Sequence, residues 1–149
     1  MDWMLMPLRR YAEFSGRSRR KEYWMFALLM AIIYTLAGVL MISSLWPMIA
    51  AGQAPTAESF TGGFLAGVVL LGLFTLAIFV PALALTVRRL HDRDLSGWWY
   101  LGVVILAQVP YLGPVVNLAF LVLMCLPGTP GPNRFSPDPK GAESYEAFA

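Results

Sequence analysis

Residues 68–94 read VVLLGLFTLAIFVPALALTVRRLHDRD, an apolar run that ends in seven residues holding five charges and the only histidine. No charged residue occurs from 62 to 87, and 26 residues are enough to cross a bilayer as a tilted helix. Charge gathered at the end of such a run is typical of a membrane boundary. The pattern therefore predicts a transmembrane span at 62–87, followed by a charged loop at 88–94.

A second uncharged run covers residues 24–46 and supplies about 35 Å of helix, enough for one crossing. It is longer than the apolar core of a cleavable signal peptide, so we interpret it as a retained anchor. Tyr23, Trp24 and Trp46 bracket it as aromatic belts would, and Pro47 is expected to end the helix. With 58% apolar and 13% charged residues, the composition is that of a membrane protein.

The third apolar segment, residues 98–126, is interrupted by PYLGP at 110–114, a strong turn or kink signal. One interpretation is a single kinked crossing, which the short arms favour. The other is a tight hairpin of two short helices, which the turn residues favour and which we prefer. The predicted fold is an all-α membrane protein, a small transmembrane bundle of three hydrophobic segments, or four helices if the third segment is a Pro-broken hairpin.

The chain accordingly divides into three predicted parts. Residues 1–22 form an amphipathic basic leader, with a short helix running onward from Pro7. Residues 23–126 form the transmembrane domain. Residues 127–149 begin with a loop of five prolines and two glycines in thirteen residues, which excludes regular helix or strand, and end in an acidic tail that we expect to be disordered.

The positive charges predict the orientation in the membrane. Residues 1–23 and 88–94 hold nine of the eleven Lys and Arg residues, whereas the connector at 47–61 holds none and has only Glu58. Because positively charged loops stay in the cytoplasm, the N-terminus and the 88–94 loop are predicted to be cytoplasmic. We therefore expect a multi-pass membrane protein with these two segments on its cytoplasmic side.

The 88–94 loop has the richest chemistry. An Arg88–Asp92 ion pair is feasible if the helix continues through it, and Asp94 or Ser96 can cap the next helix. His91, oriented by Asp92, could move a proton. One histidine and one aspartate do not make a metal site, and no serine or cysteine stands in a nucleophile motif. We therefore predict no catalytic residue, no metal and no cofactor.

Three segments together resemble a family of bacterial inner-membrane proteins known as domain of unknown function 805. They are FSGRSRRKEYW at 14–24, VRRLHD at 87–92 with SGWW at 96–99, and GTPGPNRFSPDP at 128–139. Asp94 and Ser136 stand where the family often shows glycine. The resemblance implies an integral inner-membrane protein of a few helices and carries no agreed activity. It also implies that the three charged segments belong to one pattern.

We therefore expect one cytoplasmic-face cluster that contacts an anionic phospholipid headgroup or a protein partner. Its predicted members are Arg17, Arg19, Arg20, Arg88, Arg89, His91, Asp92, Asn133, Arg134 and Asp138. Asp138 is expected to pair with an arginine of the 88–94 loop. Besides the lipid bilayer, the partners considered are a second copy of the chain or another membrane protein, but not nucleic acid, because the net charge is only +2.

The leading hypothesis is a non-enzymatic binding protein. One alternative is a transporter or channel component working as an oligomer, since three or four helices are too few to enclose a pore alone. Another alternative is a membrane enzyme acting on a phosphate-bearing lipid, with His91 and Asp92 as acid and base and the arginines as a phosphate clamp.

Overall fold

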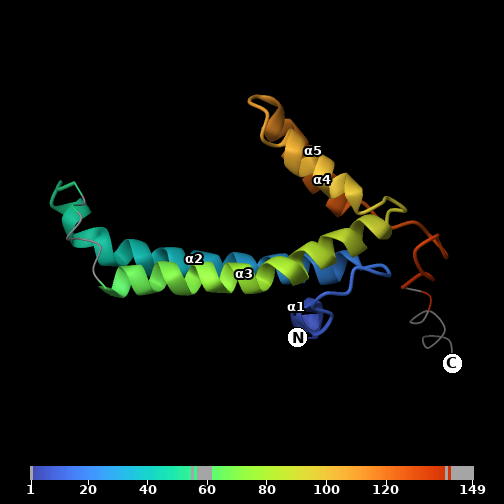
Figure 1. Ribbon diagram of the computed structural model, residues 1–149, viewed down its shortest axis with the longest axis horizontal. Helices are drawn as coiled ribbons and strands as arrows, with labels where there is room; N and C mark the ends of the chain where they lie inside the picture. The colour runs from blue at the N-terminus through green and yellow to red at the C-terminus, as the bar shows by residue number, and fades with distance from the viewer. Residues whose placement is uncertain (1, 55, 57–61, 140, 142–149) are drawn as a thin grey trace. The chain divides into compact units, whose positions relative to one another are not determined.

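A computed structural model describes residues 2–54, 56, 62–139 and 141 (Figure 1). Its helices, in chain order, are α1 (Asp2–Arg9), α2 (Arg20–Ala50), α3 (Gly62–His91), α4 (Trp98–Leu106) and α5 (Leu112–Cys125). Among these described residues the only β-pairing is an isolated bridge between Asn133 and Ser136. The all-α class is confirmed. Glu58 and the acidic segment 142–149, predicted to be disordered, lie outside the described residues.

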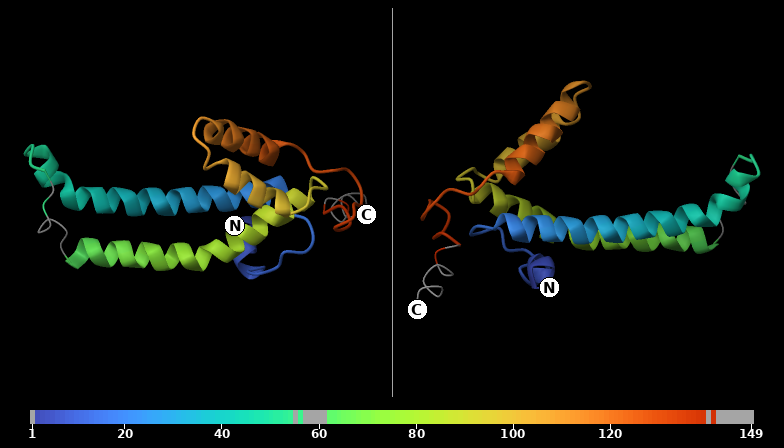
Figure 2. Two further views of the ribbon diagram at one scale, coloured as in Figure 1. Left: turned by 45° about the horizontal axis from the view of Figure 1, so that its top comes forward. Right: turned by 180° about the vertical axis from the view of Figure 1, so that it is seen from behind.

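Two compact units make up the chain, and each is described by itself. One unit is Ala27–Phe79, and the other combines Met1–Phe26 with Val80–Ala149. In the first unit α2 and α3 run side by side, as Figures 1 and 2 both show. The Tyr34 hydroxyl shares a hydrogen bond of 3.0 Å with Thr75 Oγ1. This bond links the two helices through side chains in an otherwise apolar stretch.

The outward faces of α2 and α3 are apolar. Leu40, Leu70 and Leu76 are 71%, 67% and 71% exposed, and such large exposed apolar surfaces are costly in water but not in a lipid environment. Both helices are long and apolar enough to cross a membrane, at 31 residues for α2 and 28 for the apolar part of α3. The two runs predicted at 24–46 and 62–87 thus lie within long helices.

The ends of the long helices differ from the prediction. The helix α2 continues through Pro47 to Ala50, so the expectation that Pro47 ends it was wrong. One proline removes a single backbone hydrogen bond, and the helical bonds on either side of it outweigh that loss. The helix α3 continues to His91 and keeps Arg88, Arg89 and His91 in its last turn. Cations are stabilised there because the carbonyl end of a helix is negative.

The leader also forms a helix, but in a different place. The helix α1 covers Asp2–Arg9 and has Pro7 near its end, so the expectation of a helix running onward from Pro7 was wrong. The Arg19 guanidinium and the Lys21 ammonium group lie 5.7 and 5.3 Å from the centroid of the Trp3 ring in α1. These cation–π contacts attach α1 to the start of α2.

The third apolar segment is broken where the PYLGP sequence stands. Tyr111 has a φ of 65° between α4 and α5, and a side chain at Gly113 would overlap the Ala107 carbonyl oxygen. The two helices then contact each other, with the rings of Tyr100 and Phe120 5.6 Å apart. The break is therefore a tight turn between two short helices that pack together.

Neither predicted side chain forms the cap of α4. The N-cap residue is Gly97, which has no side-chain hydrogen bond, and Ser96 Oγ accepts only a long 3.5 Å contact from the Trp98 amide. A Cβ atom at Gly97 would lie 2.7 Å from Val87 Cγ1. Close packing against α3, rather than capping, thus explains the residue at this position.

Candidate functional site

Asp92, the first residue after α3, lies between two arginines. Its Oδ1 accepts a hydrogen bond of 2.9 Å from Arg17 Nε, and its Oδ2 accepts another from Arg89 Nη1. All three side chains are at least 94% buried. Because a buried charge is costly unless it is paired, each of these groups depends on the others for its place in the fold.

Glu22 forms the second buried ion pair, with Arg88. Its Oε1 lies 3.3 Å from Arg88 Nη2, and the Ser18 hydroxyl donates a hydrogen bond to its other oxygen. The Ser18 amide in turn donates to the Arg88 carbonyl at 3.1 Å. The predicted Arg88–Asp92 pair was therefore wrong: Arg88 turns toward α2, and Arg89 takes Asp92 three residues along the same helix.

Arg88 also donates hydrogen bonds to the turn that contains Arg10 and Glu13. Arg88 Nη1 donates to the carbonyl oxygens of Glu13 and Arg10 at 2.5 and 3.2 Å. The Arg10 guanidinium donates two hydrogen bonds to the Glu13 carboxylate, and these bonds lower the pKa of Glu13 and raise the pKa of Arg10. The leader is thus joined to the end of α3 by backbone carbonyls.

We call Arg17, Glu22, Arg88, Arg89 and Asp92 the buried charge cluster. It holds three guanidinium groups against two carboxylates, and among the described residues Arg88 Nε has no hydrogen-bond partner. Backbone carbonyls supply the remaining acceptors, including Met124 O and Leu126 O for Arg89. Because these carbonyls lie at the C-terminal end of α5, its helix dipole adds to their attraction. The cluster still carries one more positive than negative charge.

The proline-rich loop folds over the end of α3. The Thr129 amide donates to the Asp92 carbonyl at 2.8 Å, and Asn133 Nδ2 donates to the His91 carbonyl at 2.8 Å. The His91 ring stacks on Phe135 at 3.9 Å between centroids, and its Nδ1 lies 3.2 Å from the Gly16 carbonyl. His91 is therefore oriented by these groups rather than by the Asp92 carboxylate.

Arg17 also holds the loop in place. Its Nη1 and Nη2 donate to the carbonyls of Gly131 and Thr129 at 2.7 and 2.5 Å. The amide of Gly131 donates to Asp138 Oδ2 at 3.1 Å. Thus one guanidinium group connects the leader, the end of α3 and the proline-rich loop.

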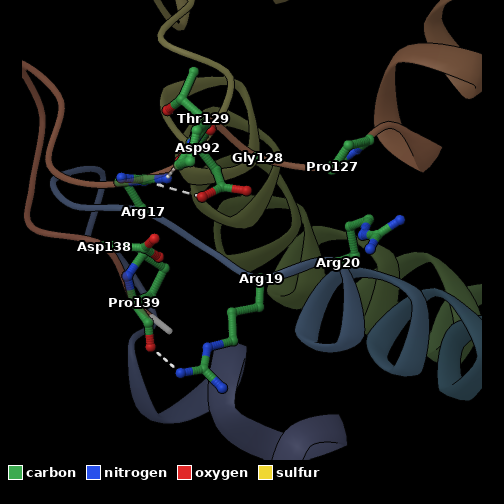
Figure 3. A pocket seen from close by; sticks show the side chains of 10 residues that line it. Arg17, Arg19, Arg20, Asp92, Pro127, Gly128, Thr129, Asp138 and Pro139 are labelled. Atoms are coloured by element: carbon green, nitrogen blue, oxygen red, sulfur yellow. Dashed lines mark hydrogen bonds and ion pairs between the residues drawn. The ribbon is translucent and has the colours of Figure 1, made fainter. Parts of the chain in front are cut away.

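A cavity of about 410 Å³ opens beside the buried charge cluster (Figure 3). Its lining residues come from the leader, the start of α2, the end of α3 and the loop: Arg17, Arg19, Arg20, Asp92, Pro127, Gly128, Thr129, Pro130, Asp138 and Pro139. Arg19 points toward the Pro139 carbonyl and donates to it, whereas Arg20 points away from Asp92. Three arginines therefore line the cavity, and the guanidinium groups of Arg19 and Arg20 point in different directions.

The predicted site residues fall into three groups. Arg17, Arg88, Arg89 and Asp92 are buried in ion pairs, while His91 and Asn133 are half-buried beside them. Arg19, Arg20 and Asp138 line the cavity. Arg134 pairs with Asp94 at the surface, 3.2 Å apart. Within the described residues, no group of three His, Cys, Asp or Glu side chains could hold a metal ion.

The three quoted segments are thus neighbours in space, and the part of the chain that contains most of them matches a known protein family. Residues 11–137 match the family model described as "Protein of unknown function (DUF805)". The chain belongs to the DUF805 family. Its relatives in Escherichia coli (strain K12) include "Inner membrane protein YhaI", 41% identical over 140 residues that cover 94% of this chain and 97% of the relative. "Inner membrane protein YhaH" of the same strain is 39% identical over 140 residues, which cover 94% of this chain and 98% of the relative. No solved structure gives a significant match.

Two residues of the DUF805 segments were missed in the sequence analysis. Glu22, the partner of Arg88, stands in FSGRSRRKEYW four residues after Ser18, a spacing that places the two side chains on one helical face. Phe135, which stacks on His91, lies in the proline-rich loop and had no such signal. Asp94 has a φ of 58°, a left-handed conformation that glycine adopts without strain.

Proposed function

We propose that this DUF805 protein is a multi-pass inner-membrane protein whose cytoplasmic face binds an anionic phospholipid headgroup and catalyses no reaction. The relatives named as inner membrane proteins and the two long apolar helices support the location. The observation that carries the binding role is the cavity with Arg19 and Arg20 in its wall, next to a buried cluster that has one surplus positive charge. A phosphate group would be stabilised by both.

A binding role fits the contacts of Asp92 and His91 better than a catalytic one. Each carboxylate oxygen of Asp92 accepts a hydrogen bond from an arginine, so both oxygens are already engaged within the fold. The His91 ring is stacked on Phe135 and does not contact Asp92 through any hydrogen bond in the described residues. The pair therefore lacks the geometry of an acid and its orienting base.

The same proposal includes a topology. We place the N-terminus, the 88–94 segment and the proline-rich loop in the cytoplasm, with α2 and α3 crossing the membrane. The α4–α5 pair is then a hairpin that enters from the cytoplasmic side and returns to it. Contacts between Thr129 and Asp92 and between Asn133 and His91 support this topology, because they require the loop and the end of α3 to be on one side.

A reporter fused to the C-terminus should therefore be cytoplasmic. Green fluorescent protein is expected to fluoresce there, and alkaline phosphatase is expected to be inactive, because it folds only in the oxidising periplasm. A matched fusion within the 47–61 connector should give the opposite result. An active phosphatase at the C-terminus would contradict the hairpin and would separate the loop from the end of α3.

Lipid binding is tested by removing the two cavity arginines together. The Arg19→Gln/Arg20→Gln double variant is expected to bind phosphatidylglycerol at least about tenfold more weakly, because two charge-assisted hydrogen bonds to phosphate are lost. Affinity is measured by native mass spectrometry of detergent-purified protein titrated with lipid.

The control is Arg9→Gln/Arg134→Gln, which removes the same charge from exposed positions outside the cavity. Its affinity for phosphatidylglycerol should stay within about twofold of the wild type, because neither side chain lines the cavity and exposed charges are screened. An equal loss in both double variants, or a wild type with no preference for phosphatidylglycerol over phosphatidylcholine, would refute the proposal.

A further inference from the structure

A second hollow lies next to the arginine-lined cavity. Its volume is about 380 Å³ and its lining residues are Arg20, Lys21, Trp24, Met25 and Cys125. Both hollows lie in the volume range of small-molecule sites, about 300–1,000 Å³. Arg20 lines both of them. The two hollows are therefore adjacent, with one side chain at their junction.

The walls of the two hollows differ in chemistry. The first is lined by charged side chains and by the backbone of a proline-rich loop. The second hollow is lined by Arg20 and Lys21, by the next-turn residues Trp24 and Met25 of α2, and by Cys125 at the end of α5. Arg20 Nη1 donates a hydrogen bond of 3.2 Å to the Cys125 carbonyl. This bond holds the Arg20 guanidinium group where the two hollows meet. The first hollow thus has more charged lining residues than the second, which is the more apolar groove, and the two share Arg20.

This order of surfaces matches one class of ligand. A glycerophospholipid has a phosphate group at one end and acyl chains at the other, and it meets a helical protein with its phosphate near the ends of spans. Trp24 begins the apolar part of α2, where tryptophan commonly sits at the headgroup level. The backbone amides at the start of α2 add partial positive charge close to Arg19 and Arg20.

We propose that the two hollows form one site for a single anionic glycerophospholipid, with its phosphate in the cavity that Arg19 and Arg20 line and the start of an acyl chain along Trp24, Met25 and Cys125. This inference rests on the proposed lipid-binding function and extends it from a headgroup contact to a site with an acyl groove. Lys21 also lines the groove, and its ammonium group lies 5.3 Å from the centroid of the Trp3 ring.

The only cysteine of the chain reports directly on the groove. Bound phosphatidylglycerol should slow the reaction of Cys125 with N-ethylmaleimide about tenfold at a lipid concentration ten times its Kd, because only the empty fraction reacts. Phosphatidylcholine at the same content in the same detergent should leave the rate unchanged. Soluble glycerol phosphate should also leave it unchanged, since it has no acyl chain.

A groove-filling variant tests the same site without the cysteine. Met25→Trp is expected to lower the affinity for phosphatidylglycerol about tenfold, equivalent to about two buried methylenes, whereas Met25→Leu should keep it. If Met25→Trp does not fold, the reaction of Cys125 with N-ethylmaleimide is measured in Arg20→Gln instead. Phosphatidylglycerol should then no longer protect Cys125. Protection by phosphatidylcholine or by glycerol phosphate, or protection retained in Arg20→Gln, would overturn the inference.

The results separate failure of this inference from failure of the proposed function. If the Arg19→Gln/Arg20→Gln variant loses phosphatidylglycerol while Cys125 is never protected and Met25→Trp binds normally, headgroup binding stands and the acyl groove is refuted. If the wild type shows no preference for phosphatidylglycerol in native mass spectrometry, both are refuted.

Discussion

Replacing Asp92 with asparagine is expected to lower the free energy of unfolding by about 3–5 kcal/mol, because it removes the negative charge between two buried guanidinium groups. Arg17 and Arg89 are 5% and 0% exposed, so neither can reach water without opening the packing at the end of α3. Asparagine keeps the shape of aspartate and one acceptor oxygen, so little of the loss is steric. The measurement is the thermal unfolding midpoint of detergent-purified protein.

The matched control is Asp94→Asn, the same substitution two residues along. Asp94 pairs with Arg134 at 3.2 Å, but the two side chains are 46% and 59% exposed, and exposed pairs contribute about 0–1 kcal/mol. Asparagine also tolerates the φ of 58° at this position. Equal midpoints for the two variants would show that the Arg17–Asp92–Arg89 arrangement does not stabilise the fold.

Adding one methyl group at Gly128 is expected to cost about 3 kcal/mol, because the new Cβ atom would overlap the Asp92 carboxylate. An exposed carboxylate could rotate away from such a group. That of Asp92 is held on both oxygens by Arg17 and Arg89, so Gly128→Ala must displace either the ion pairs or the proline-rich loop. The thermal unfolding midpoint again measures the effect.

Gly102→Ala is the control for Gly128→Ala. A Cβ atom at Gly102 meets nothing within 4 Å, and alanine in the interior of a helix is more stable than glycine by about 1 kcal/mol. The midpoint of this variant should therefore stay or rise. A Gly128→Ala protein as stable as the wild type would mean that the loop does not lie against Asp92.

These variants separate two roles among the arginines. Arg17, Arg88 and Arg89 are buried in ion pairs and hold the fold together, so their loss should act through stability. Arg19 and Arg20 line the cavity, so their loss should act mainly through lipid affinity and should lower the unfolding midpoint less than the loss of a buried arginine does. A comparison of midpoint and affinity in each variant therefore distinguishes structural arginines from ligand-binding ones.

Local sequence patterns were enough to predict the helical class, the two long apolar helices and the family. These properties depend on composition and on the spacing of charges along the chain, since 26 uncharged residues need a helix to satisfy their backbone groups in a membrane. The PYLGP break could also be predicted from the sequence, because proline restricts the backbone locally and glycine gives it extra freedom. Each of these signals lies within one stretch of chain.

The ion-pair partners were decided only by the tertiary structure. Helical spacing alone made Arg88 a candidate for Asp92, yet Arg88 meets Glu22, 66 residues away, and Arg89 takes Asp92. That choice depends on how the starts and ends of α2, α3 and α5 approach each other, because a buried charge takes the partner that packing brings to it. The cavity beside Arg19 and Arg20 likewise exists only where four separate segments meet.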